Sequence, residues 1–103
     1  MDNNRVLEIL KKYPNRIPVI LNVVNKEIKL QKNKFLVYPS LMVGMFIYTL
    51  LHNNNLKSSD SIYLTTQNGI MISTKDTFEY LHHNYKNIDN ILYLNCIKEN
   101  VFG

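Results

Sequence analysis

The chain has 103 residues, 46% of them hydrophobic, and its twelve Lys and Arg against eight Asp and Glu give a formal net charge of +4. These values predict one domain with one core, and a preference for acidic partners or anionic membrane surfaces that does not single out nucleic acid. Cys96 is the only cysteine, which excludes an intramolecular disulfide. No apolar stretch approaches the roughly 18 to 20 residues of a membrane span, and none resembles a signal peptide, so we expect a cytoplasmic protein.

The first predicted element is a short helix within residues 1–13. Val6, Leu7 and Leu10 recur at helical spacing, so one face of the segment is apolar. Pro14 ends the helix, because a proline disfavours helical geometry in the residue before it.

Two strands are predicted next. Residues 17–24 are mostly β-branched and apolar, and apolar residues alternate with polar ones from Ile28 before the apolar run 35–37. The two segments are expected to form an antiparallel hairpin that turns near residues 25–26.

The middle of the chain predicts a helix and a strand. Ser40 is a candidate N-cap for an apolar helix over residues 41–52, and a polar asparagine run follows it. Residues 62–64 predict a third strand. Residues 67–69 predict a turn in which Gly69 adopts positive φ.

The last part of the chain predicts one more helix and one more strand. Thr74 is a candidate cap for a helix through Leu81, and residues 91–97 predict the final strand. The order helix, strand, strand, helix, strand, helix, strand is typical of the α+β class. It predicts a β-grasp, with a four-stranded mixed sheet packed on a central helix and a short N-terminal helix.

Five stretches of the chain resemble motifs of one known family. They are Lys12-Tyr13-Pro14-Asn15-Arg16-Ile17-Pro18-Val19-Ile20, Lys34-Phe35-Leu36-Val37, Leu41-Met42-Val43-Gly44-Met45-Phe46, Ile91-Leu92-Tyr93-Leu94 and the end Val101-Phe102-Gly103. Together they are similar to the autophagy ubiquitin-like modifiers, the GABARAP and light chain 3 family. Members usually carry two helices before the Lys-Tyr-Pro run, whereas only one fits here.

This resemblance implies a ubiquitin-like domain over residues 1–103, with the N-terminal helix in 1–13, the β-grasp core in 14–100 and a conjugation tail in 101–103. Gly103 would be activated as a thioester and joined to the amine of phosphatidylethanolamine on autophagosomal or related membranes. Glycine suits this role, because it has no side chain to block an enzyme's narrow active site. The implied partners are the activating and conjugating enzymes of autophagy, a processing and delipidating cysteine protease, and a membrane that contains phosphatidylethanolamine.

The resemblance also implies a second activity, the docking of cargo receptors with acidic-aromatic peptide motifs. Residues 34–37 are expected to form a sheet edge, to which an extended peptide can add as another strand. The pocket for the peptide's aromatic residue would be lined by Ile9, Pro18, Lys34, Leu36 and Ile91. The pocket for its aliphatic residue would be lined by Phe35, Val37, Leu41, Phe46 and Leu50. Acidic residues of the peptide would be held by Arg16, Lys32 and Lys34.

Two other function classes stay open at this point. A ubiquitin-like modifier can also be joined to a protein lysine, and a small basic domain can bind nucleic acid. The Lys-Tyr-Pro run favours the lipid-linked branch over the first alternative. The second lacks an aromatic-basic motif that would stack on bases, so no nucleic-acid partner is expected.

The sequence predicts no enzyme, no metal site and no cofactor. His82 and His83 are adjacent on a predicted helix and therefore point in directions about 100° apart. Cys96 alternates with apolar residues on the last predicted strand, so it is interpreted as a buried small hydrophobe rather than a nucleophile.

Overall fold

The computed structural model describes residues 3–56 and 61–99. Its helices and strands follow in the predicted order, namely α1 (Asn3–Lys12), β1 (Ile17–Val23), β2 (Lys34–Val37), α2 (Val43–Asn53), β3 (Ile62–Thr66), α3 (Phe78–Tyr85) and β4 (Leu92–Lys98). The type and the order of all seven predicted elements are confirmed. Within these described residues, no helix has the length and apolar character needed to span a bilayer.

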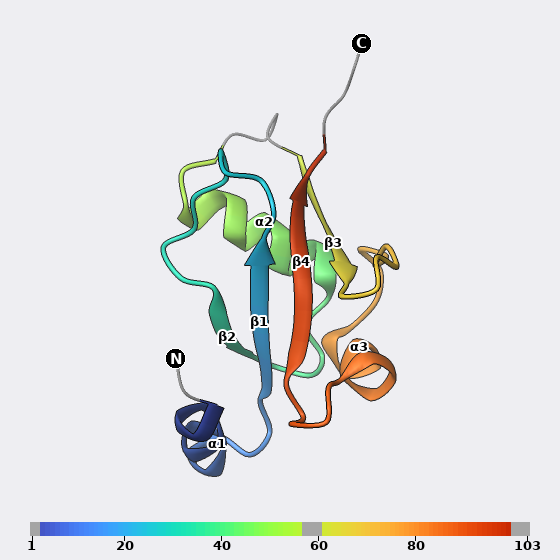
Figure 1. The fold of residues 1–103 in the computed structure, drawn as a ribbon. Coiled ribbons are helices and arrows are strands. Elements are labelled where there is room, and N and C mark those ends of the chain that lie inside the picture. The colour runs from blue at the N-terminus through green and yellow to red at the C-terminus, as the bar shows by residue number, and fades with distance from the viewer. Residues whose placement is uncertain (1–2, 57–60, 100–103) are drawn as a thin grey trace.

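The four strands form one mixed sheet in the order β2-β1-β4-β3 (Figure 1). Strand β1 pairs antiparallel with β2 and parallel with β4, and β3 pairs antiparallel with β4. Strand β2 is therefore an edge strand, as the sequence predicts, and β3 is the other edge.

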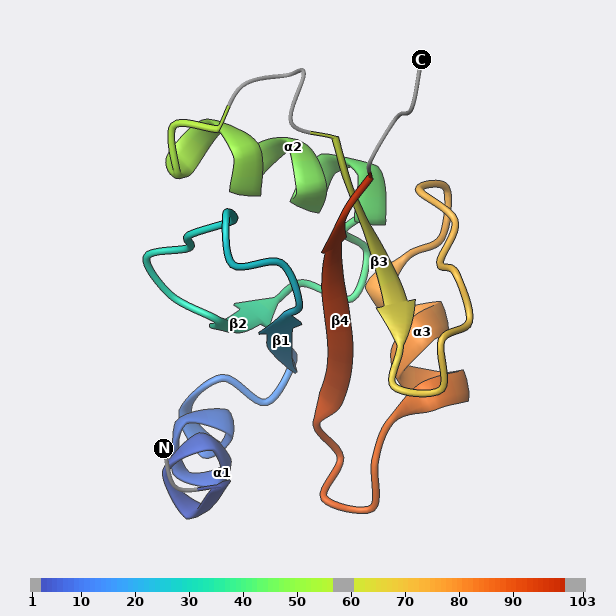
Figure 2. The same cartoon turned by 45° about the horizontal axis from the view of Figure 1, so that its top comes forward.

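The core lies between one face of the sheet and the helices α2 and α3. Alternate residues of β4 are buried, as expected for a strand with one covered face, and in β1 the same alternation includes one more buried residue, Pro18. The ring of Phe46 on α2 packs edge to face against Phe35 of β2, at 5.2 Å between ring centroids, and against Phe78 of α3, at 5.0 Å. Helix α1 lies on the opposite side of the sheet from α2 (Figure 2).

The start of α2 differs from the sequence prediction. We expected Ser40 to cap a helix from residue 41, but α2 begins at Val43, with Met42 at the N-cap and no side-chain cap. The helix needs no such cap, because backbone carbonyls of a neighbouring loop accept its first N–H groups. The amide of Val43 donates to the Asp76 carbonyl, and that of Gly44 to the Thr74 carbonyl, both at 2.9 Å.

The cap of α3 was also predicted at the wrong residue. Thr77 is the N-cap, and its hydroxyl oxygen accepts a hydrogen bond from the Tyr80 amide at 3.3 Å. The predicted cap, Thr74, lies in a turn closed by the Asp76 amide and the Ser73 carbonyl, so the chain is not yet helical there.

The connection between β1 and β2 is longer than predicted. Strand β2 begins at Lys34 rather than near Ile28, and residues 24–33 form an irregular connection. Ile28 is buried in the core, and its amide closes a turn by donating to the Asn25 carbonyl. The apolar and polar alternation in this segment therefore reflects a half-buried loop, whose Gln31 amide is held by the Asn54 side chain of the α2 C-cap.

Candidate functional site

The free edge of β2 offers unpaired backbone groups. Strand β1 is its only neighbour in the described sheet. The Leu21 amide of β1 donates to the Asn33 carbonyl at 2.8 Å, just before β2 begins, so Leu21 and Asn33 form a hydrogen-bonded pair. Hydrogen-bonded and non-hydrogen-bonded pairs alternate along an antiparallel ladder, so the next residue and the one two places further, Lys34 and Leu36, turn their N–H and C=O groups away from β1. A further strand could pair with these groups.

The edge at β3 is partly covered by the chain that follows it. After the turn at residues 67–69, where Gly69 adopts the predicted positive φ of 86°, the chain runs back along β3. The Thr66 amide donates to the Ile70 carbonyl at 2.9 Å, and the Ile72 amide donates to the Leu64 carbonyl at 3.0 Å. Strand β2 is therefore the more accessible edge.

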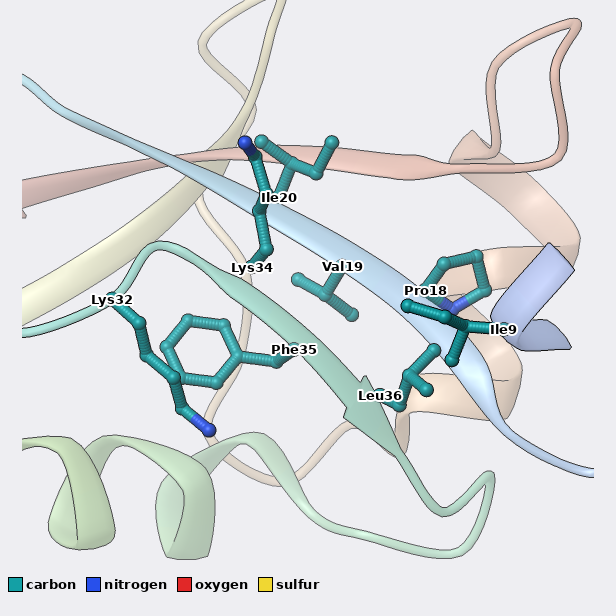
Figure 3. Close-up of a pocket in the computed structure, with 8 residues that line it drawn as sticks. All are labelled: Ile9, Pro18, Val19, Ile20, Lys32, Lys34, Phe35 and Leu36. Atoms are coloured by element: carbon teal, nitrogen blue, oxygen red, sulfur yellow. The ribbon is translucent and has the colours of Figure 1, made fainter. Parts of the chain in front are cut away.

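A pocket of about 320 Å³ lies beside β2 (Figure 3). Its walls come from α1, β1, β2 and the connection before β2, with Ile9, Pro18, Val19, Ile20, Lys32, Lys34, Phe35 and Leu36 as lining residues. Pairing explains part of this set, because Pro18 lies opposite Leu36 and Ile20 opposite Lys34. Figure 3 shows Ile9, Pro18 and Leu36 gathered at one end and Phe35 with Lys32 at the other, toward α2.

Four of the five residues expected around the aromatic pocket come together in this pocket, namely Ile9, Pro18, Lys34 and Leu36. The fifth, Ile91, is not among the lining residues and has no exposed surface. Val19 and Ile20 also line the pocket and were not predicted. For Ile20 a signal existed, because it lies two residues after Pro18 in a strand and so shares its face.

The residues expected around the aliphatic pocket lie at the boundary between β2 and the core. Val37, Phe46 and Leu50 are buried core residues, whereas Phe35 and Leu41 are partly buried and pack against that core. These five residues are therefore both core and support for the edge strand. The two partly buried members, Phe35 and Leu41, keep some surface that a ligand could touch.

The three expected cations occupy opposite ends of β2. Lys32 and Lys34 line the pocket, and the Lys32 ammonium lies 5.3 Å from the centre of the Phe35 ring. Arg16 precedes Ile17, which pairs with Val37 at the far end of the strand. Three residues of strand span roughly 10 Å, so Arg16 and the two lysines would meet different parts of an extended peptide.

The chemistry of the remaining candidates is limited. Burial raises the pKa of the Cys96 thiol from 9.0 to about 11, which keeps it in the protonated form, a weak nucleophile. Across residues 3–56 and 61–99, no three His, Cys, Asp or Glu side chains come together as a possible metal site. Gly103 and the predicted conjugation tail lie outside the described residues. Strand β4 ends at Lys98, and the Glu99 amide then donates to the Ser61 carbonyl at 2.8 Å.

Comparison with known proteins places this fold in a family. A family model described as "Autophagy protein Atg8 ubiquitin like" matches residues 2–103. The chain is 33% identical to autophagy-related protein 8e of Arabidopsis thaliana over 97 residues, which covers 92% of this chain and 79% of that protein. It is 29% identical to microtubule-associated protein 1 light chain 3 gamma of Homo sapiens over 101 residues, 95% of this chain and 69% of that protein.

A solved structure also matches. The crystal structure of Trypanosoma brucei ATG8 superposes with a TM-score of 0.82 at 26% sequence identity, and the match covers 98% of this chain and 88% of that one. The predicted ubiquitin-like β-grasp is thereby confirmed.

Proposed function

This chain belongs to the Atg8 family of ubiquitin-like autophagy proteins, and we propose that it acts as a membrane-conjugated modifier that docks receptors. In this proposal, Gly103 is joined to phosphatidylethanolamine on autophagosomal or related membranes. The protein is cytoplasmic before conjugation. The observation that carries the docking part is the apolar pocket beside the free edge of β2.

The docked ligand is an extended peptide with an aromatic residue followed three places later by an aliphatic one. Its backbone pairs with the outward N–H and C=O groups of Lys34 and Leu36. The pocket volume of about 320 Å³ lies at the small end of ligand pockets, which run from about 300 to 1,000 Å³. It therefore suits one large side chain in contact with Ile9, Pro18 and Leu36.

The positive charge of two lysines beside the pocket favours acidic residues next to the aromatic residue of the peptide. Lys32 and Lys34 both line the pocket, and Figure 3 shows the Lys34 ammonium group beside Ile20 and the Lys32 ammonium group beside Phe35, so carboxylates placed before the aromatic residue would meet one of these two groups. Since Lys32 is exposed, this attraction is screened by salt and contributes less than the apolar contact.

The conjugation chemistry uses the chain as acyl donor and not as catalyst. The carboxyl group of Gly103 is first held as a thioester on the cysteine of a conjugating enzyme. The amine nitrogen of the lipid attacks the glycyl carbonyl carbon, the bond from carbon to sulfur breaks, and the enzyme's sulfur leaves as a thiolate, which takes up the proton that the amine loses as the amide forms. The proposed partners are the activating and conjugating enzymes, the processing and delipidating cysteine protease, and receptors with acidic-aromatic motifs.

Mass spectrometry of the membrane-bound form tests the conjugation. We expect a phosphatidylethanolamine mass on Gly103, and we expect Gly103→Ala to keep the fold and lose membrane recovery, because a methyl group obstructs the acyl-transfer site. Circular dichroism of both forms controls for folding. A protein lysine attached to Gly103 would support the alternative conjugation to protein, and wild-type membrane recovery of the variant would contradict the proposal.

A further inference from the structure

The end of β4 lies beside the turn that follows β1 (Figure 1). The parallel pairing of the two strands runs to Val23 and Cys96, and the Val24 amide then donates to the Cys96 carbonyl at 3.0 Å. After this bond the chain from β1 turns, and the Ile28 amide donates to the Asn25 carbonyl at 3.1 Å. The backbone of β1 therefore leaves β4 before β4 itself ends.

The side chain of Asn25 extends the contact between the two strands. Its Oδ1 accepts a hydrogen bond from the Lys98 amide at 2.7 Å, in the place that a strand carbonyl would otherwise take. On the opposite side of β4, the Glu99 amide donates to the Ser61 carbonyl at 2.8 Å. Successive N–H groups of a strand point to opposite neighbours, so the end of β4 is held from both sides.

Burial decreases along the same residues of β4. Cys96 is fully buried, Ile97 and Lys98 are half-buried, and Glu99 is exposed. A strand end that leaves the core frays unless hydrogen bonds hold it. The bond from Lys98 to Asn25 therefore matters more for the position of this end than a bond deep in the sheet would.

The end of β4 is close in sequence to the proposed acyl donor. Four residues follow Glu99, and the last of them is Gly103. Four residues of fully extended chain span at most about 14 Å. The positions of Lys98 and Glu99 therefore limit the volume that the carboxyl group of Gly103 can reach. A smaller volume gives a higher effective concentration at an enzyme's cysteine when the domain is docked there.

We propose that Asn25 is a positioning residue for conjugation, an inference that rests on the proposed role of Gly103. Asn25 holds the Lys98 amide and so fixes the point at which the chain leaves the sheet toward the conjugating enzyme. It acts on the reaction through β4 and touches no reacting atom. Local sequence does not reveal this role, because Asn25 and Lys98 are 73 residues apart.

The test measures thioester formation on the conjugating enzyme, with the full chain at varied concentration, ATP, and the activating and conjugating enzymes of its own system. Asn25→Ala should lower kcat about two- to tenfold, the range that one hydrogen bond accounts for, and leave KM unchanged, because the surface that docks on the enzyme stays intact. Asn25→Asp keeps the acceptor oxygen and should restore kcat to within about twofold of the wild type. Asn25→Gln displaces that oxygen by one methylene group and should behave like Asn25→Ala.

Asn22→Ala is the matched control. The Asn22 Nδ2 donates to the Asn95 Oδ1 at 3.1 Å, so this side chain also links β1 to β4, but at a position before the end of β4. Both alanine variants lose one hydrogen bond between the strands, and Asn22→Ala should keep the wild-type kcat and KM. Amide hydrogen exchange followed by NMR checks the bond itself. The Lys98 amide should exchange faster in Asn25→Ala and at the wild-type rate in Asn22→Ala.

The possible results separate the role of Asn25 from the proposed conjugation of Gly103. A wild-type kcat in Asn25→Ala would overturn the role of Asn25 and leave the conjugation standing. An equal loss of kcat in Asn22→Ala would also overturn it, because stability rather than position would then control the rate. A wild-type chain that forms no thioester would overturn the proposed conjugation and the role of Asn25 together.

Discussion

The two edges of the sheet, β2 and β3, are treated differently by the fold. The chain after β3 turns back and hydrogen-bonds to Leu64 and Thr66, whereas β2 keeps its outer backbone groups unpaired by another strand. An open edge is a hazard, because it can pair with any extended chain. The chain itself thus covers one edge and leaves the other open, and the open edge is the one that the proposed docking would use.

The segment that covers the β3 edge, residues 70–76 and called the cover below, is also part of the core. Ile72 is buried, and the carbonyls of Thr74 and Asp76 accept hydrogen bonds from the first amides of α2. The cover thus provides hydrogen-bond partners both for the edge of the sheet and for the start of a helix. Strand β2 has only four residues and lysines at one end, which limits unspecific pairing without closing the edge.

The largest expected effect concerns Cys96 on β4, the strand between β1 and β3. Burial raises its pKa to about 11, and a rise from 9.0 lowers the thiolate fraction at pH 7.5 about 100-fold. Since the thiolate reacts with thiol reagents, we expect labelling in native buffer to be about 100-fold slower or more than in concentrated urea. Rapid labelling of the native protein would mean that the core and the segment covering β3 open readily. The β3 edge would then not be closed, contrary to the difference between the two edges described above.

The second prediction tests the open edge. Leu36→Ala removes apolar contact from the β2 pocket, and burying a side chain of this size contributes roughly 1.5 to 3 kcal/mol. Affinity for an acidic-aromatic peptide, measured by calorimetric titration, should therefore fall about tenfold or more. The control is Met71→Ala, because Met71 is an exposed residue of the cover at the other edge. Equal peptide binding by Leu36→Ala would show that β2 is not the docking edge.

The third prediction tests the closed edge. A Cβ at position 44 would lie 3.2 Å from the Thr74 carbonyl oxygen and 3.3 Å from the Thr74 Cβ. Gly44→Ala should press against this loop and lower the free energy of unfolding by about 1 to 3 kcal/mol, as overpacking does. Urea denaturation measures the effect, and Met45→Ala, at an exposed position of the same helix, should change it by no more than about 0.5 kcal/mol. No loss of stability in Gly44→Ala would mean that the cover is not held tightly against α2.

The smallest effect is expected for charge at the open edge. Lys32 is exposed beside Phe35, so Lys32→Ala should weaken binding of the acidic-aromatic peptide by at most about fivefold. The loss should shrink as salt is added, because exposed charges are screened. Lys75→Ala is the matched control. If Lys32→Ala lost more peptide affinity than Leu36→Ala, charge would contribute more to docking than apolar contact, contrary to this prediction.

The existence of the four strands could be read from the sequence, because a covered strand repeats every two residues, although the same alternation from Ile28 belongs to a loop and misplaced the start of β2. This period predicted the burial of Cys96, and the same rule could have placed Ile20 beside Pro18. Helix starts were predicted less well. Ser40 and Thr74 have suitable side chains for capping, but the first amides of α2 are satisfied by a loop about thirty residues later in the chain, which local sequence does not reveal.

The sequence by itself determined the family, the order of the elements and the strand that forms the open edge, because these depend on motifs and on local periodicity. Tertiary structure decided which candidate residues meet. Ile91 and Arg16 stand at motif positions, yet Ile91 is fully buried and Arg16 lies at the far end of β2 from Lys32. The cover over β3 was decided in the same way. A motif specifies a position along the chain, whereas packing between distant segments specifies which side chains share a cavity and which edge remains open.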